Sequence, residues 1–133
     1  MDARRVDHIG IAVQDLEKAL AFWRDRLGLP LEGIEDVPEM KVRVAKLRVG
    51  ETRIELLFPL PGEEAVTRFL EKRGEGIHHV CLAVPDAAEA TAEMKGKGLT
   101  PVYASPKAGA GGHQVNFLPP KETGGVLIEI SSE

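Results

Sequence analysis

The sequence predicts an α+β fold made of two βαβββ modules. One observation is an internal repeat, because DHIGIAVQDLEKA at residues 7–19 resembles HHVCLAVPDAAEA at residues 78–90. Another is that three strand-like runs follow each copy. The length of 133 residues suits one domain of two half-size modules and excludes two full domains. We expect the modules at residues 5–60 and 75–131.

The first module begins with a strand at residues 6–13, where apolar side chains alternate with other residues. Asp15 follows and can cap a helix, because its carboxylate accepts from the free amides of the first turn. This helix should end at Gly28. Its expected buried stripe consists of Leu16, Ala19, Leu20, Trp23 and Leu27. Three strands are expected next, at about 31–36, 41–49 and 53–58.

The second module repeats this order, with a strand at 77–84 and a helix at 87–97 that Asp86 caps and Gly98 ends. Its remaining strands are expected at about 100–104, 114–118 and 126–130. Between the modules, PGEEAVTRFLEKRGEG predicts a linker helix at about residues 63–73.

The composition narrows the function classes. A formal net charge of −4 argues against an extended nucleic-acid surface, which needs clustered lysine and arginine. No apolar run approaches the roughly 20 residues that span a bilayer, and the N-terminus lacks the apolar segment of a secretory signal. The single cysteine, Cys81, has no partner for an internal disulfide. We therefore expect a cytoplasmic protein.

Two histidines and two glutamates occupy matching positions in the modules. His8 and His79 lie on strand faces that carry mostly small side chains, and Glu55 and Glu129 each interrupt an aliphatic strand. A buried carboxylate is unfavourable unless it is paired or coordinated. If the modules are related by a pseudo-twofold axis and curve toward each other, the four side chains converge on one divalent metal ion.

The alternative is structural. A lone histidine of this kind is usually a hydrogen-bonded core residue, and a lone glutamate can be a charge on an edge strand. The matched pairs favour the metal hypothesis, because all four residues then have a common explanation. His78 lies on the opposite strand face and is expected to be structural, whereas Cys81 shares the face of His79 and should line the cavity.

Several motifs carry a resemblance to a known family. They are DHIGIAV, the PE of VPEMKVRVA, IELLFPL, AVTRFLEKRGEGIHHVCLAV and SPKAGAGGHQVNFLPPKETGGVLIEI. With them the chain resembles the vicinal-oxygen-chelate superfamily and, within it, the methylmalonyl-CoA epimerases. The resemblance implies that the two βαβββ modules form a barrel-like cup around a metal site. The last motif is the most diagnostic, because its P-K-x-G-x-G-G, N-F-x-x-P-K and G-V-L-x-E differ from the D-P-D-G ending common in glyoxalase I.

The resemblance implies a metal-dependent isomerase that interconverts (R)- and (S)-methylmalonyl-CoA in propionyl-CoA metabolism. It implies that His8, Glu55, His79 and Glu129 bind one divalent ion such as cobalt or manganese, with Gln replacing Glu at position 55 in some members. The ion would stabilise the enolate formed when the proton next to the thioester is removed.

Inversion needs two proton carriers. Some family members have a catalytic glutamate where this chain has Val44, so we take Glu39, the nearest carboxylate, as one candidate. Its alternative is a solvated loop residue beside Pro38. The other candidates are Glu129, by shifting off the metal, and a water molecule at the metal.

Six residues of the second module are candidates for substrate binding. The glycine-rich loop KAGAGG can present backbone amides to a carboxylate, and two lysines can attract the acidic CoA moiety. The same residues also fit a plain turn and ordinary surface charge. The candidates are Lys107, Gly111, Gly112, Gln114, Asn116 and Lys121.

Two other functions fit the same fold. A glyoxalase I-like lyase acting on a hemithioacetal can use the same ligands, and a non-catalytic small-molecule-binding protein need not keep all four. An iron dioxygenase would use two histidines and a single carboxylate, so Glu55 disfavours it. A homodimer is expected, because the fold commonly forms one.

Overall fold

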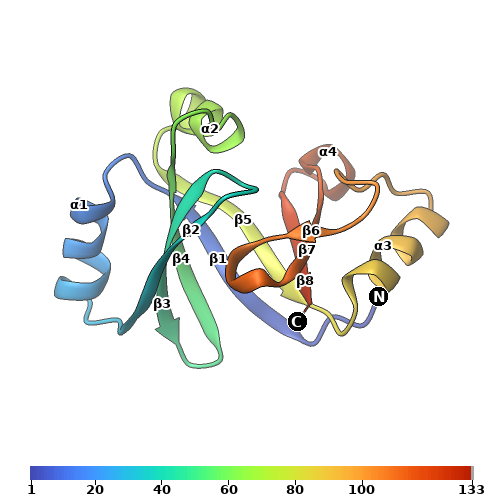
Figure 1. Cartoon of the computed structure of the whole chain (residues 1–133), viewed down its shortest axis with the longest axis horizontal. Coiled ribbons are helices and arrows are strands. Elements are labelled where there is room, and N and C mark those ends of the chain that lie inside the picture. Colours follow the sequence, from blue (N-terminus) through green and yellow to red (C-terminus); the bar gives the residue numbers. More distant parts are fainter. Residues whose placement is uncertain (133) are drawn as a thin grey trace. The chain divides into compact units, whose positions relative to one another are not determined.

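Two units of similar build make up the structure, a computed structural model that describes residues 1–132. The first unit comprises His8–His78, and the second comprises Met1–Asp7 and the chain from His79 onward. Figure 1 shows the helices and strands of both. Among the described residues, every helix is too short or too polar to cross a lipid bilayer.

The first unit contains a four-stranded sheet in the order β2-β3-β4-β1. Its strands are β1 (Arg5–Ala12), β2 (Leu31–Val37), β3 (Val42–Val49) and β4 (Thr52–Pro59). The strands β2, β3 and β4 pair antiparallel, whereas β1 pairs parallel with β4. The first three residues of β1 belong to the second unit. The predicted strands are confirmed to within one or two residues.

One helix covers one face of this sheet (Figure 1). It begins as α1 (Leu16–Leu20), where the Asp15 carboxylate accepts from Lys18 N at 3.1 Å, as predicted. It continues as a π-helical segment, η1 (Ala21–Arg26). The buried core between helix and sheet consists of Val13, Leu20, Ala45, Leu47 and Leu56.

The predicted stripe is wrong at one position. Leu27 is 53% exposed, although Leu16, Ala19 and Trp23 do pack against the core. Leu27 N donates to Phe22 O at 2.9 Å, which is the i to i−5 bond of a π-helical turn. Because such a turn contains more residues than an α-helical turn, Leu27 rotates off the stripe.

Helix α2 (Ala65–Arg73) lies in the first unit and buries Val66 and Leu70, in agreement with the helix expected at 63–73. Its first turn is held by Glu63, whose carboxylate accepts from Val66 N at 2.8 Å and Thr67 N at 2.9 Å. These bonds satisfy amides that have no partner within the helix.

The second unit contains the sheet β5-β8-β7-β6. Its strands are β5 (Gly76–Ala83), β6 (Lys107–Ala108), β7 (Gln114–Leu118) and β8 (Ile128–Ser132), and the first three residues of β5 belong to the first unit. Helix α3 (Ala87–Gly96) packs on β7 and β8 through a core of Val84, Ala87, Ala90, Met94, Leu118 and Ile130. Two short helices, η2 (Ala110–Gly112) and α4 (Pro120–Thr123), complete the unit (Figure 1).

The strand predicted at residues 100–104 is wrong, because this segment is irregular and the strand before β7 is the two-residue β6. One of its backbone groups bonds to a neighbouring strand, since Val102 N donates to Phe117 O of β7 at 2.8 Å, and side chains satisfy several others. The Glu122 carboxylate accepts from Thr100 N, and Asn116 both accepts from Tyr103 N and donates to Tyr103 O. The element order is nevertheless β-α-β-β-β in both halves, so the predicted fold class is confirmed.

Leu56 gives a test of the first unit's core. It is fully buried beneath the helix, so Leu56→Ala should lower the free energy of unfolding by about 2–5 kcal/mol. Val49→Ala is the control, since Val49 lies exposed on the neighbouring strand and its truncation should change the value by less than about 0.5 kcal/mol. Urea denaturation followed by circular dichroism measures both. Equal effects would contradict this description of the core.

Candidate metal and substrate site

The first unit pairs a histidine with a glutamate across two parallel strands. His8 lies on β1 and Glu55 on β4, and His8 Nδ1 lies 3.4 Å from Glu55 Oε2. The strand register matches His8 with Arg53 and Gly10 with Glu55, so the two side chains share one face of the sheet. The Arg53 guanidinium lies 3.9 Å from the same carboxylate oxygen. The buried Glu55 carboxylate therefore has both the His8 imidazole and the Arg53 guanidinium beside it.

The second unit contains a matching pair. His79 lies on β5 and Glu129 on β8, and His79 Nε2 lies 3.0 Å from Glu129 Oε1. Here the register matches Cys81 with Glu129. In both units the glutamate is thus opposite the residue two positions after the histidine. The internal repeat of the sequence extends to the strand pairing that creates each pair.

All four side chains are buried. Burial of a carboxylate or an imidazolium away from water is unfavourable unless a partner compensates it, and each pair supplies that partner. Imidazole nitrogens and carboxylate oxygens are also the donors that divalent transition metals accept. The donor chemistry of both pairs therefore fits a metal ion.

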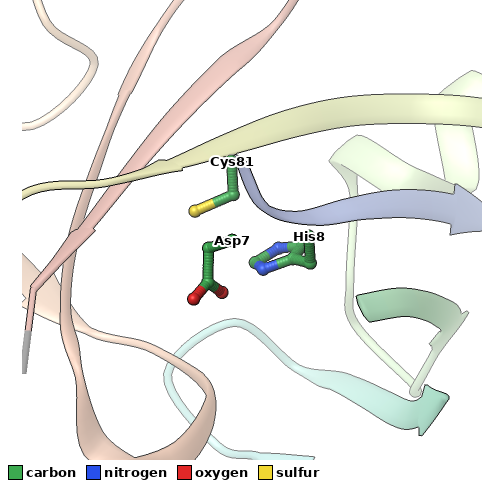
Figure 2. Close-up of side chains that lie close together, drawn as sticks. All are labelled: Asp7, His8 and Cys81. Atoms are coloured by element: carbon green, nitrogen blue, oxygen red, sulfur yellow. The ribbon is translucent and has the colours of Figure 1, made fainter. Parts of the chain in front are cut away.

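Figure 2 shows Asp7, His8 and Cys81. Asp7 and Cys81 belong to the second unit, where a carboxylate oxygen of Asp7 and the Cys81 sulfur lie within 4.8 Å of each other. The chain before Asp7 runs beside β5, because Arg4 N donates to Ala83 O at 2.8 Å. Cys81, the single cysteine of the sequence, is buried on the face of His79, as expected.

The predicted substrate residues all lie in the second unit, and they differ in exposure. Gly111 and Gly112 are exposed in the turn η2, and both have positive φ values, which favour glycine. Lys107 is exposed on β6, and its ammonium lies 4.4 Å from the centre of the Tyr103 ring. Gln114 on β7 and Lys121 on α4 are exposed. These five residues are accessible to a ligand.

Asn116 differs from the other five, because the structure gives it an internal role. Its side chain is fully buried. Its Oδ1 accepts from Tyr103 N at 3.0 Å and Phe117 N at 2.8 Å, and its Nδ2 donates to Thr91 Oγ1 and Tyr103 O. These contacts assign the Asn116 amide to the interior of the second unit, and the expectation that Asn116 lines a substrate cavity beside Gln114 stays a prediction. Alternation alone could not show that the amide would hold the irregular segment 100–106.

Glu39 lies exposed in the turn between β2 and β3. This turn is closed by Lys41 N, which donates to Val37 O at 2.8 Å. Glu39 is therefore beyond the ends of the strands that carry His8 and Glu55. Its role as a proton carrier stays a hypothesis.

Sequence reasoning missed three charged residues near Glu55. Lys46 is opposite Glu55 in the antiparallel pairing of β3 and β4, and its ammonium lies 2.6 Å from Glu35 on β2. The third residue is Arg53, two residues before Glu55, whose guanidinium lies 3.9 Å from the Glu55 carboxylate. Strand alternation could have placed Arg53 on the face of Glu55, but only the strand register brings Lys46 and Glu35 to this face.

Comparison with known proteins identifies the class. A family model described as the glyoxalase/bleomycin resistance protein/dioxygenase superfamily matches residues 7–117. The mitochondrial methylmalonyl-CoA epimerase of Mus musculus is 41% identical over 95% of this chain and 71% of that protein. The ethylmalonyl-CoA/methylmalonyl-CoA epimerase of Cereibacter sphaeroides is 40% identical over 95% of this chain and 96% of that protein.

A solved structure agrees with these relatives. It is a variant of the Streptomyces coelicolor methylmalonyl-CoA epimerase in complex with 2-nitronate-propionyl-CoA, with a TM-score of 0.94 and 34% identity. The match covers 99% of this chain and 96% of that chain. The chain therefore belongs to the glyoxalase/bleomycin resistance/dioxygenase superfamily and, within it, to the family of methylmalonyl-CoA epimerases. The resemblance inferred from the motifs is confirmed.

The internal role of Asn116 can be tested by Asn116→Leu, which keeps the side-chain volume and removes the amide. The variant should lose at least about 2 kcal/mol of unfolding free energy, because Tyr103 and Thr91 are left with unsatisfied polar groups. Gln114→Leu, on the same strand but exposed, is the stability control. A raised KM for the substrate with unchanged stability would instead support the original substrate-binding hypothesis for Asn116.

Proposed function

We propose that the protein interconverts (R)- and (S)-methylmalonyl-CoA by removing and returning the proton on the carbon next to the thioester. The observation that carries this proposal is the repeated, buried His–Glu pair in a member of the epimerase family. The relatives named as methylmalonyl-CoA epimerases, and the solved complex with 2-nitronate-propionyl-CoA, support an acyl-CoA substrate.

We further propose that His8, Glu55, His79 and Glu129 together bind one divalent metal ion, with cobalt and manganese as the first candidates. The support is their donor chemistry, their burial and their equivalent positions in the two units. When bound, such an ion supplies a positive charge that stabilises the negative oxygen of an enolate.

The substrate suits this site chemically. Its reacting carbon lies between a thioester carbonyl and a carboxylate, which makes the proton acidic and gives two oxygens for recognition. Under the proposal, exposed groups of the second unit bind the acyl-CoA: the backbone of Gly111 and Gly112 faces the carboxylate, and Lys107, Gln114 and Lys121 contact polar groups of the CoA moiety.

Inversion at this carbon requires one group to take a proton from one side and another group to return a proton to the other side. Glu129 is our candidate for one of these groups. For the second, the sequence suggested Glu39, whose exposed position gives it no described contact with the residues of either pair.

Two further properties, location and oligomeric state, are part of the proposal. The protein is proposed to act in the cytoplasm as a homodimer. A dimer is supported by large apolar side chains that are exposed in the first unit, namely Phe22, Leu27, Ile34 and Val49.

The proposed reaction predicts solvent exchange at the reacting carbon. Metal-loaded protein in D₂O should place deuterium on C2 of either epimer of methylmalonyl-CoA, with loss of stereochemical purity, as followed by NMR. Glu129→Ala and a chelated sample should each abolish the exchange. A metal-loaded protein that leaves C2 unlabelled would reject the epimerase and favour the runner-up function, a lyase acting on a hemithioacetal.

The two glutamates should differ in their tolerance of substitution. Glu55→Gln keeps an oxygen donor beside His8 and should retain activity within about tenfold, since the proposed role of Glu55 is binding alone. Glu129→Gln should lose about 10²–10⁴-fold in kcat, because a proton carrier is lost as well. Steady-state rates with metal content measured for each variant make the comparison. Equal losses at equal metal content would contradict a catalytic role for Glu129.

A further inference from the structure

A short ion pair lies beside the His8–Glu55 pair in the first unit. Lys46 Nζ on β3 donates to Glu35 Oε1 on β2 at 2.6 Å. The antiparallel register places Lys46 opposite Glu55 and Val44 opposite Glu35. Because Val44 and Lys46 are two residues apart in one strand, they share a face. Glu35, Lys46, Glu55 and His8 therefore lie on one face of the sheet β2-β3-β4-β1.

This face is opposite the one that the helix covers. Ala45 and Leu47, the strand neighbours of Lys46, belong to the core beneath α1. The Lys46–Glu35 pair is therefore not part of the helix-packing core, and it shares its face with a proposed metal ligand.

Stability alone does not explain the pair. Lys46 is only 17% exposed and Glu35 is 37% exposed. A lysine of this burial loses hydration, and an ion pair near a surface typically returns little net stability. The neighbouring residues provide a comparison on the other face, where Asp36 pairs with Arg43 at 2.7 Å and the side chains are 49% and 43% exposed. That pair has the geometry of an ordinary surface bridge.

We propose that Glu35 is a proton carrier of the epimerisation and that Lys46 is the positioning residue that holds its carboxylate. This inference rests on the proposed function and adds a residue to it. Glu35 comes from a strand of the sheet that carries His8 and Glu55, and its carboxylate is held by the bond from the Lys46 ammonium. Among the carboxylates of the first unit's described residues, Glu32 also lies on β2, but it is bridged to the two guanidinium groups of Arg48 and Arg53.

The step balances without a further reactant. The Glu35 carboxylate takes the proton from C2, the carbon–hydrogen bond breaks, and its electron pair passes into the enolate of the thioester. A new O–H bond forms on Glu35. A second carrier returns a proton to the opposite side of the planar carbon, and the reverse reaction uses the same two groups in the opposite order.

The test uses Glu35→Gln in metal-loaded full-length protein, with each epimer of methylmalonyl-CoA supplied separately in D₂O. A two-carrier enzyme that lacks one carrier should fall at least about 100-fold in the rate of inversion. It should still exchange C2 hydrogen for deuterium in one epimer, with retention of configuration, because the remaining carrier removes and returns that proton. NMR and chiral analysis of the product measure exchange and inversion independently.

Asp36→Asn is the matched control, since it removes a carboxylate from the adjacent residue and breaks an ion pair of similar length on the opposite face. It should keep wild-type exchange and inversion. Inversion that persists in Glu35→Gln, or a loss of exchange and inversion in equal proportion for both epimers, would overturn the role of Glu35. If Glu39→Gln loses inversion and keeps exchange in one epimer only, while Glu35→Gln does not, the proton carrier is Glu39. That result would also overturn the role of Glu35.

The positioning role of Lys46 is tested separately, by the steady-state kinetics of Lys46 variants. Lys46→Met should lower kcat by about tenfold to a hundredfold with little change in KM, and Lys46→Arg should restore part of the loss, because a cation again holds Glu35. A change confined to KM would contradict a positioning role. If wild-type protein itself catalyses no exchange at C2, the proposed function fails, which is distinct from a wild-type enzyme that Glu35→Gln leaves unchanged.

Discussion

A buried imidazole–carboxylate pair across two parallel strands is the interaction on which the rest of the structure depends. Parallel pairing of β1 with β4, and of β5 with β8, places the first and last strands of each repeat side by side. In sequence, the helix and the two other strands of each repeat therefore lie between these two paired strands. The shared register then positions each glutamate opposite the residue two after the histidine. A shift by one residue would turn either side chain to the other face of its sheet.

The parts of the fold that depend on neighbours in sequence could be predicted. Asp15 and Asp86 cap their helices because the carboxylate of each aspartate accepts a hydrogen bond from a backbone amide of the first helical turn. This depends only on neighbours in sequence. The positions of His8 and His79 on small-residue faces, and of Glu55 and Glu129 opposite the aliphatic faces of their strands, also followed from alternation. What alternation does not determine is which strands pair and in what register. The Lys46–Glu35 pair depends on that register, and the internal role of Asn116 depends on a loop thirteen residues away.

The two errors have different physical origins. A local π-helical turn rotates Leu27 into solvent. Segment 100–106 forms no strand, because the side chains of Glu122 and Asn116 take up several of its backbone hydrogen bonds and only Val102 N bonds to β7. In this second case tertiary contacts override the local pattern. The residues proposed for chemistry are clustered where polar groups are buried in pairs. This is consistent with the general tendency of functional sites to violate the simple rule that apolar side chains fill the interior.

The central proposal is that His8, Glu55, His79 and Glu129 are ligands of a single metal ion. Its most direct test is the number of cobalt ions bound per chain, measured by equilibrium dialysis for the wild type and for His8→Ala and His79→Ala, with folding of each variant checked by circular dichroism. The account predicts one tightly bound ion per wild-type chain and a large loss of affinity in either variant, because each removes a ligand of the same ion. Two ions per chain, or full affinity after removal of one histidine, would contradict it.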